Sequence, residues 1–98
     1  MRVVWTDKAQ ARLREIQAYI ARDSPQRALS VVERLIARSA TLADPPLLGR
    51  PVPEYPRSDL RELLERPFRL IYRVRDDRID ILSVKHYRQR LSDDPQDL

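Results

Sequence analysis

The last third of the chain contains three short apolar segments, at residues 60–64, 68–74 and 79–88. Within the middle segment Phe68, Leu70 and Tyr72 alternate with residues that include two arginines. Such alternation is typical of a β-strand with one face buried and the other in water. Only a few residues separate the three segments, so the strands are joined by turns and must run antiparallel. The chain therefore ends in a small antiparallel sheet.

Two amphipathic helices are predicted before these strands. The first is indicated by apolar residues at spacings of three and four, namely Ala9, Leu13, Ile16 and Ile20. Thr6 is a suitable N-cap for it. The second helix starts at Ser24-Pro25, where serine caps and proline suits the first helical position, and it ends before Asp44-Pro45-Pro46. The short break between the helices predicts an antiparallel helical hairpin.

The remaining segments complete the expected fold. Residues 2–5 are β-branched and aromatic, which favours an opening strand, and the proline-rich residues 45–56 form a loop. The order β-α-α-β-β-β indicates an α+β domain over residues 1–91, with the helical hairpin on one face of an antiparallel sheet and the other face partly open. Residues 92–98 are polar and are expected to fray, although the order leaves room for a short C-terminal helix.

Composition narrows the class of protein. The chain has 98 residues and a net charge of +4, and every basic residue except Lys8 and Lys85 is arginine. Arginine suits bidentate contact with phosphate or carboxylate, although a GC-rich genome produces the same bias. The absence of cysteine and the single histidine argue against a metal site, and no signal or membrane-spanning segment is recognisable. We expect a cytoplasmic protein without metal, cofactor or membrane contact.

The basic side chains of the three strands are candidates for contact with an anionic target. They form, with their neighbours, a set of seven residues: Arg61, Arg69, Arg73, Lys85, His86, Tyr87 and Arg88. The structural alternatives are ion pairs of Arg61 and Arg73 with acidic residues on adjacent strands, and a hydrogen-bonded His86 at the edge of the core. On the latter reading, His86 shares one strand face with Leu82 and Val84.

Several segments, taken in this order, resemble the RelE/ParE superfamily of bacterial toxins, most closely its ParE branch. They span almost the whole chain: Val4-Trp5-Thr6, Asp23-Ser24-Pro25, residues 49–54, residues 60–63, residues 69–74, and Val84-Lys85-His86 followed by Arg88. The resemblance implies a type II toxin–antitoxin role, with an acidic, partly disordered antitoxin that alone contacts operator DNA. ParE-like toxins, often called plasmid-stabilisation proteins, are associated with inhibition of DNA gyrase. RelE-like toxins cleave messenger RNA on the ribosome.

The choice between these activities rests on a few positions. A RelE-like nuclease would use His86, Tyr87, Arg69 and Arg61, because histidine titrates near neutrality and arginine binds phosphate. Those relatives also carry a carboxylate after a Gly-basic-Pro turn, where this chain has Val52 and then Glu54 two residues later. We therefore favour a gyrase poison without a firmly assigned catalytic residue, although ParE-like toxins commonly have a small residue in place of Tyr87. An inactive interaction or autoregulatory module is a third reading.

The antitoxin is expected to bind an exposed apolar groove between the helical hairpin and the proline-rich loop. Its predicted lining is Leu42, Leu47, Leu48, Val52 and Tyr55.

Overall fold

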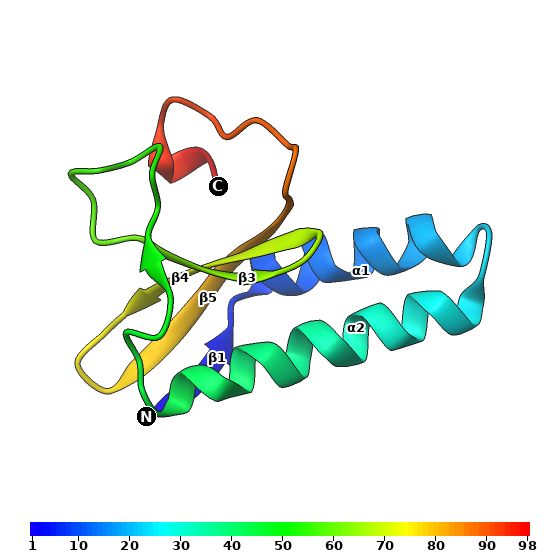
Figure 1. The fold of residues 1–98 in the computed structure, drawn as a ribbon, viewed down its shortest axis with the longest axis horizontal. Coiled ribbons are helices and arrows are strands. Elements are labelled where there is room, and N and C mark those ends of the chain that lie inside the picture. Colours follow the sequence, from blue (N-terminus) through cyan, green and yellow to red (C-terminus); the bar gives the residue numbers. More distant parts are fainter.

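A computed structural model describes all 98 residues and shows an α+β fold. The strands are β1 (Arg2–Trp5), β2 (Arg50–Pro51), β3 (Arg61–Glu65), β4 (Phe68–Val74) and β5 (Arg78–His86). The helices are α1 (Asp7–Ala21) and α2 (Pro25–Ala40), with short 3-10 helices at Thr41–Ala43 and Pro95–Asp97. The five strands form one sheet in the order β1-β5-β4-β3-β2. The two helices cover one face of it (Figure 1), as predicted.

The sheet is mixed rather than purely antiparallel. Strand β1 pairs in parallel with β5, in a register that places Val3 beside Ile79 and Trp5 beside Ile81, whereas all other pairs are antiparallel. The antiparallel prediction is wrong for β1 because its sequence neighbour is the helical hairpin, not another strand. A connection of that length allows the first strand to lie parallel to the last.

Helix caps form where the sequence predicts them. The Thr6 hydroxyl accepts a hydrogen bond from the Ala9 N–H at 3.2 Å and donates one to the Ile81 carbonyl at 2.9 Å. The cap therefore also ties the start of α1 to β5. The Ser24 hydroxyl accepts from the Arg27 N–H at 3.1 Å, and Pro25 occupies the first turn of α2. Neither α1 nor α2 combines the length and the hydrophobicity that a membrane-spanning helix requires.

The main core lies between the hairpin and the sheet. Its buried residues come from both layers: Ala9, Val31, Leu35, Leu42, Leu63, Phe68, Leu70, Tyr72, Ile79, Ile81 and Val84. The Trp5 indole N–H donates to the Ser39 hydroxyl at 3.0 Å. The fully buried Tyr72 hydroxyl donates to the Pro46 carbonyl and accepts from the Gly49 N–H, both at 3.0 Å. The polar groups of Trp5, Ser39 and Tyr72 are thus paired, as most buried polar groups are.

The second face of the sheet is covered, which corrects the expected open face. A second cluster lies there, formed by Val52, Tyr55, Leu60, Ile71, Leu91 and Leu98. The proline-rich loop and the C-terminal tail fold over the sheet on the side away from the helices (Figure 1). The tail, expected to fray, is packed against the second cluster: Leu91 before it and Leu98 at its end are buried, and the Tyr55 hydroxyl donates to the Ser92 carbonyl.

A bulge in β5 changes which side chains share a face. Ile71 pairs with Ser83 and Tyr72 with Ile81, so Leu82 has no partner in the ladder. Leu82 packs against the second cluster, whereas Val84 belongs to the main core. The predicted grouping of Leu82 with Val84 is therefore wrong, because one extra residue reverses the alternation.

A buried ionic network fixes the proline-rich loop to the second face. Arg69 donates to both Glu62 and Glu54, with 2.8 Å contacts to each Glu54 oxygen, and Arg50 reaches Glu62 at 2.7 Å. The Glu62 side chain is fully buried and that of Arg69 almost so. Hydrogen bonding to Arg69 holds the pKa of Glu54 below its usual value, and the same bonds raise the pKa of Arg69. The network joins β3, β4 and the loop.

At Gly49 the loop passes very close to the sheet. A Cβ there would collide with the Glu62 carbonyl and lie 2.8 Å from the Tyr72 hydroxyl. Only glycine allows this approach of two backbones, which explains why the single glycine of the chain stands here.

We predict that Gly49→Ala destabilises the fold by about 1–3 kcal/mol, because the methyl group must displace β3 backbone. The free energy of unfolding from urea titration measures this. Pro53→Ala, at an exposed position of the same loop, is the control and should cost much less. Equal stability of the wild type and Gly49→Ala would contradict the close approach.

Arg69→Met should cost about 3 kcal/mol or more, because it leaves buried Glu62 with only the half-exposed Arg50 as a counter-ion. The matched control is Arg73→Met, whose partner Asp59 is largely exposed, and the loss expected there is at most about 1 kcal/mol. Chemical denaturation of the two variants compares them directly. Similar losses of stability in the two variants would show that the buried Arg69 network contributes no more than an exposed ion pair.

Candidate functional site

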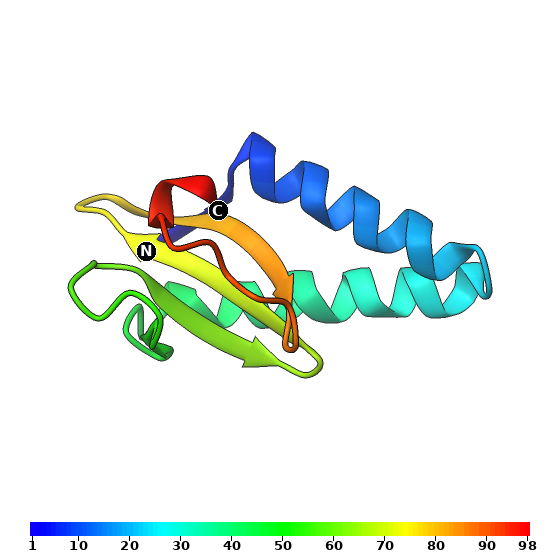
Figure 2. The ribbon, with the colours of Figure 1, turned by 90° about the horizontal axis from the view of Figure 1, so that it is seen from above.

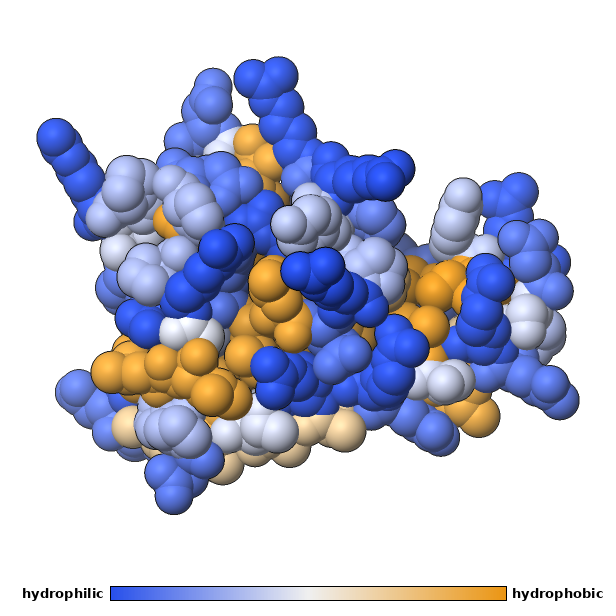
Figure 3. Space-filling view, in the orientation of Figure 1, coloured by the Kyte–Doolittle hydropathy of each residue, from blue (hydrophilic) through white to orange (hydrophobic).

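The helical hairpin extends past the end of the sheet and leaves a groove at that end. Figures 1 and 2 show the two helices running beyond the strands. The groove has a volume of about 700 Å³, and Ile16, Ile20, Val31 and Phe68 supply its apolar surface. Figure 3 shows apolar surface in the hollow between the protruding helices and the body, bordered by hydrophilic side chains. Two other hollows of the fold are smaller, at about 510 and 190 Å³.

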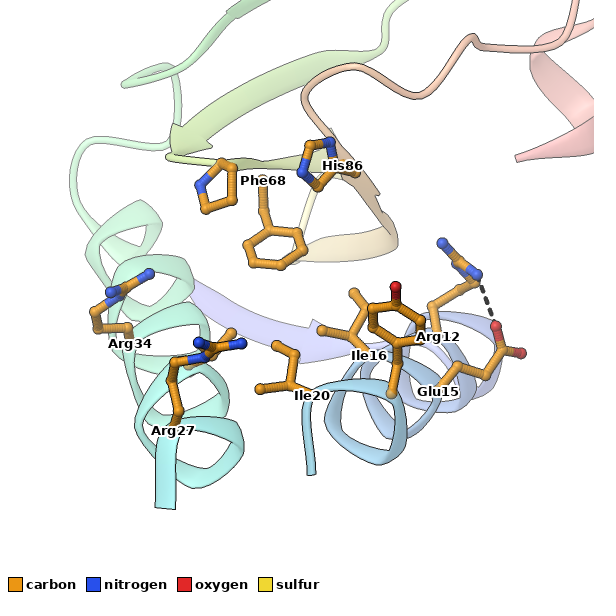
Figure 4. Close-up of a pocket in the computed structure, with 11 residues that line it drawn as sticks. Arg12, Glu15, Ile16, Ile20, Arg27, Arg34, Phe68 and His86 are labelled. Carbon is orange, nitrogen blue, oxygen red and sulfur yellow. Dashed lines mark hydrogen bonds and ion pairs between the residues drawn. The ribbon is translucent and has the colours of Figure 1, made fainter. Parts of the chain in front are cut away.

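Cationic side chains border this groove on both sides. Arg27 and Arg34 lie on α2, and Arg12 lies on α1 (Figure 4). Arg12 pairs with Glu15 at 2.6 Å and Arg34 pairs with Glu65 at 3.6 Å, whereas Arg27 has no carboxylate partner. The border is therefore positive around an apolar floor. Such a groove suits an amphipathic segment that carries carboxylates.

Strand pairing brings the histidine to the same place. Phe68 begins β4 and pairs with His86, which ends β5. The two rings meet edge to face, with centroids 5.9 Å apart and planes at 80°. The exposed His86 accepts a hydrogen bond at Nδ1 from the Arg88 N–H, at 3.1 Å. The histidine is hydrogen-bonded at the margin of the groove.

Next to the groove lies a smaller hollow of about 190 Å³, lined by Arg66, Pro67, His86, Tyr87 and Arg88. Tyr87 is 51% exposed, and the Arg66 guanidinium lies 5.9 Å from the centroid of its ring. A Tyr87 N–H bond to the Pro67 carbonyl at 2.6 Å fixes the backbone here.

Lys85 belongs to the same end of the molecule. Its partial burial, with the positive charges of Arg12 and Lys8, lowers its pKa.

The seven predicted target-binding residues divide into two groups. Lys85, His86, Tyr87 and Arg88 lie together at the end of β5. The three strand arginines lie elsewhere and are engaged within the fold. Arg61 donates to the Gly49 carbonyl at 2.6 Å, and Arg73 pairs with Asp59 at 2.9 Å. Arg69 is buried in its network, so the guanidinium face expected on these strands does not exist.

The ion pairs also differ from those considered from the sequence. Glu62 pairs with Arg50 and Arg69, and Asp80 pairs with Arg75 and Arg78. Burial opposes ionisation of Asp80, but hydrogen bonds from Arg78 and Arg75 keep its pKa below the usual value.

The residues expected of a nuclease are not gathered into one site. His86 packs on Phe68 at the hairpin side of the sheet. Arg69 faces the other side, where two carboxylates bind its guanidinium. Arg61 is held by loop carbonyls. A phosphodiester placed at His86 therefore has neither Arg69 nor Glu54 beside it.

Three of the five residues predicted to line the antitoxin groove are buried within the fold. Leu42 and Val52 are fully buried and Tyr55 nearly so, because they anchor the two cores. Leu47 and Leu48 are exposed, at 62% and 44%. The groove that does exist is lined by residues not singled out as partner contacts, among them Ile20, Arg27 and Arg34. In the sequence, the apolar spacing of Ile16 and Ile20 was the available signal for this groove. The same spacing is equally typical of residues buried in an ordinary core.

Comparisons with known proteins identify relatives of this chain. A family model described as ParE toxin of type II toxin-antitoxin system, parDE, matches residues 3–91. A Sinorhizobium fredii protein named "Putative toxin Y4kP" is 38% identical over 89 residues, which cover 91% of each chain.

Two solved structures share the fold. One, from the chromosomal ParDE system of P. aeruginosa, has a TM-score of 0.75 and 32% identity over 88% of this chain and 95% of the other. The toxin–antitoxin complex RelBE2 of Mycobacterium tuberculosis has a TM-score of 0.59 and 25% identity over 87% and 95%. The chain belongs to the ParE toxin family of type II toxin–antitoxin systems.

Proposed function

We propose that this toxin arrests growth by binding and inhibiting DNA gyrase or a related topoisomerase, and that it is not a nuclease. Membership of the ParE family supports the class of target. One observation favours binding over cleavage: His86 and Arg69 lie on opposite sides of the sheet, and the Arg69 guanidinium is already satisfied by Glu62 and Glu54.

The chemistry explains why this separation matters. Metal-independent RNA cleavage requires a base at the 2′-hydroxyl, a cation at the phosphate and an acid at the leaving oxygen. All three must lie within hydrogen-bond reach of a single phosphodiester. His86 and Tyr87 could approach one phosphate. Because Arg69 is paired with Glu54, however, neither side chain is free to act as the cation or the carboxylate of a nuclease site.

We predict that the purified toxin inhibits supercoiling by gyrase, and that His86→Ala and Tyr87→Phe retain this inhibition within about tenfold. Loss of a general acid or base would instead lower a catalytic rate by about 10²–10⁴-fold. Supercoiling and cleavage-complex assays measure the first effect. Cleavage of ribosome-bound messenger RNA at codon-spaced positions, abolished by His86→Ala, would overturn the proposal. Expression without growth arrest in a host lacking antitoxin would indicate an inactive interaction module.

We also propose that a cognate antitoxin neutralises the toxin by placing an acidic amphipathic segment in the groove at the end of the hairpin. The apolar floor of Ile16, Ile20 and Phe68 would take the hydrophobic side of that segment. Arg27 and Arg34 would face its carboxylates. A segment that is disordered when free can fold into such a groove as it binds. Any operator DNA would be contacted through the antitoxin.

The double variant Arg27→Glu/Arg34→Glu should weaken antitoxin binding by at least about tenfold, because like charges would face each other across the groove. Isothermal titration with the product of the adjacent gene measures this. Arg14→Glu/Arg57→Glu changes the charge equally at exposed positions outside the groove. Equal losses in the two double variants would show that only net charge matters and would contradict the proposed site.

A further inference from the structure

A row of cations follows the edge of the molecule where α1 meets the end of β5. We call it the basic edge and define it as Lys8, Arg12, Lys85, Arg88, Arg66 and the aromatic Tyr87. Its parts are linked by contacts: the Arg12 guanidinium reaches Gln89 at 3.4 Å, Gln89 accepts from the His86 N–H at 3.3 Å, and Arg66 lies against Tyr87. These contacts run from Arg12 on α1 to Arg66 in the turn before β4; Lys8 and Lys85 lie near enough to Arg12 for their charges to interact, and Arg88 lines one hollow with Arg66 and Tyr87.

This edge carries positive charge that the fold does not neutralise. The carboxylate of Glu15 is its only paired acid, bound to Arg12. Lys8, Arg66, Lys85 and Arg88 have no ion-pair partner, and the Arg12 Nε is buried without any hydrogen bond. In the tail, Asp94 caps its own short helix and Asp97 accepts a hydrogen bond from the Ser92 hydroxyl, and neither these two carboxylates nor that of Asp93 forms an ion pair with the edge.

Lys85 lies close to the other cations of this edge. Burial lowers the pKa of Lys85, and the positive charges of Arg12 and Lys8 lower it further. An anion bound here would relieve that repulsion, because an opposite charge within a few ångströms favours the protonated amine. The fold therefore keeps charges together that would be more stable with a counter-anion between them.

Tyr87 adds a feature that a simple charged surface lacks. Its ring is half exposed, and the guanidinium of Arg66 lies over it. An aromatic ring beside cations provides a stacking surface for a nucleobase, with the phosphates held by the cations. An acidic peptide helix instead needs an apolar floor, which the groove offers and this edge does not.

We infer that the basic edge binds the phosphodiester backbone of nucleic acid, with Tyr87 stacking on an unpaired or distorted base. This inference rests on the proposed function: the nucleic acid is the DNA held by the topoisomerase. The toxin then contacts DNA as well as the enzyme. Backbone contacts of this kind position a protein and do not read sequence. They therefore differ from operator recognition.

Direct binding of the purified toxin to fluorescent oligonucleotides tests this inference. The probes are one sequence as single-stranded DNA, as duplex DNA and as RNA, with anisotropy followed across a salt titration. Binding should weaken with salt at a slope of about −0.7 per phosphate contact for a single strand and about −0.9 for a duplex. The triple variant Lys8→Ala/Lys85→Ala/Arg88→Ala should lose at least about tenfold in affinity and about two units of slope.

A matched triple variant, Arg14→Ala/Arg22→Ala/Arg57→Ala, removes the same charge at other exposed positions and should change affinity much less. Because Lys85 is partly buried, Arg66→Ala/Arg88→Ala, which alters only exposed side chains, provides a second test with the same expected direction. Tyr87→Ala should weaken single-strand binding by about tenfold, the loss expected for one stacked base.

Three results would overturn the inference: equal losses in both triple variants, polyglutamate binding as tightly as DNA, or no binding at low salt. None of them depends on gyrase. Inhibition of supercoiling without DNA binding would remove only this inference, whereas DNA binding without any effect on gyrase would remove the proposed target. Preference for RNA over both DNA probes would exclude the topoisomerase-bound strand as the ligand.

Discussion

The buried guanidinium of Arg69 holds the second layer of this fold together. It lies on the sheet face away from the helices and binds carboxylates from β3 and from the proline-rich loop. The loop is thereby fixed across the sheet, with Gly49 against the β3 backbone and Tyr55 against the tail. Buried charges are stable only when they are paired. Loss of one partner leaves the remaining charges unpaired and strongly destabilises the fold. This network keeps the second face closed.

Closure of that face limits where a partner can bind. Both sheet faces are buried, and most of the strand arginines are engaged in ion pairs or carbonyl contacts. The protruding end of the helical hairpin remains open, together with the end of β5 beside it. An apolar groove with a positive border and an adjoining basic edge lie there. The features suited to partners are therefore concentrated at one end of the molecule.

The groove and the basic edge share a border, which suggests how neutralisation would work. Arg12 lines the groove and belongs to the basic edge, and His86 lies between the groove and the smaller hollow of Arg66 and Tyr87. An acidic segment in the groove would cover or neutralise these residues. Antitoxin and nucleic acid would then compete through charge at neighbouring sites, without any change in the fold of the toxin.

The sequence alone determined the local structure and the fold class. Thr6 and Ser24 set the helix starts, and the alternation in residues 68–74 set a strand. These features depend on neighbouring residues, so periodicity and capping reveal them. The family resemblance likewise followed from the order of these elements.

Only the tertiary structure decided which side chains are free. A one-residue bulge at Leu82 reversed the strand phase, and folding of the loop and tail over Ile71 buried Arg69, Val52 and Tyr55. Parallel pairing of β1 and the groove between the hairpin and Phe68 also arise from contacts between residues far apart in the chain. A pattern within one segment cannot report what another segment will cover, and that covering determines which charges can bind a partner.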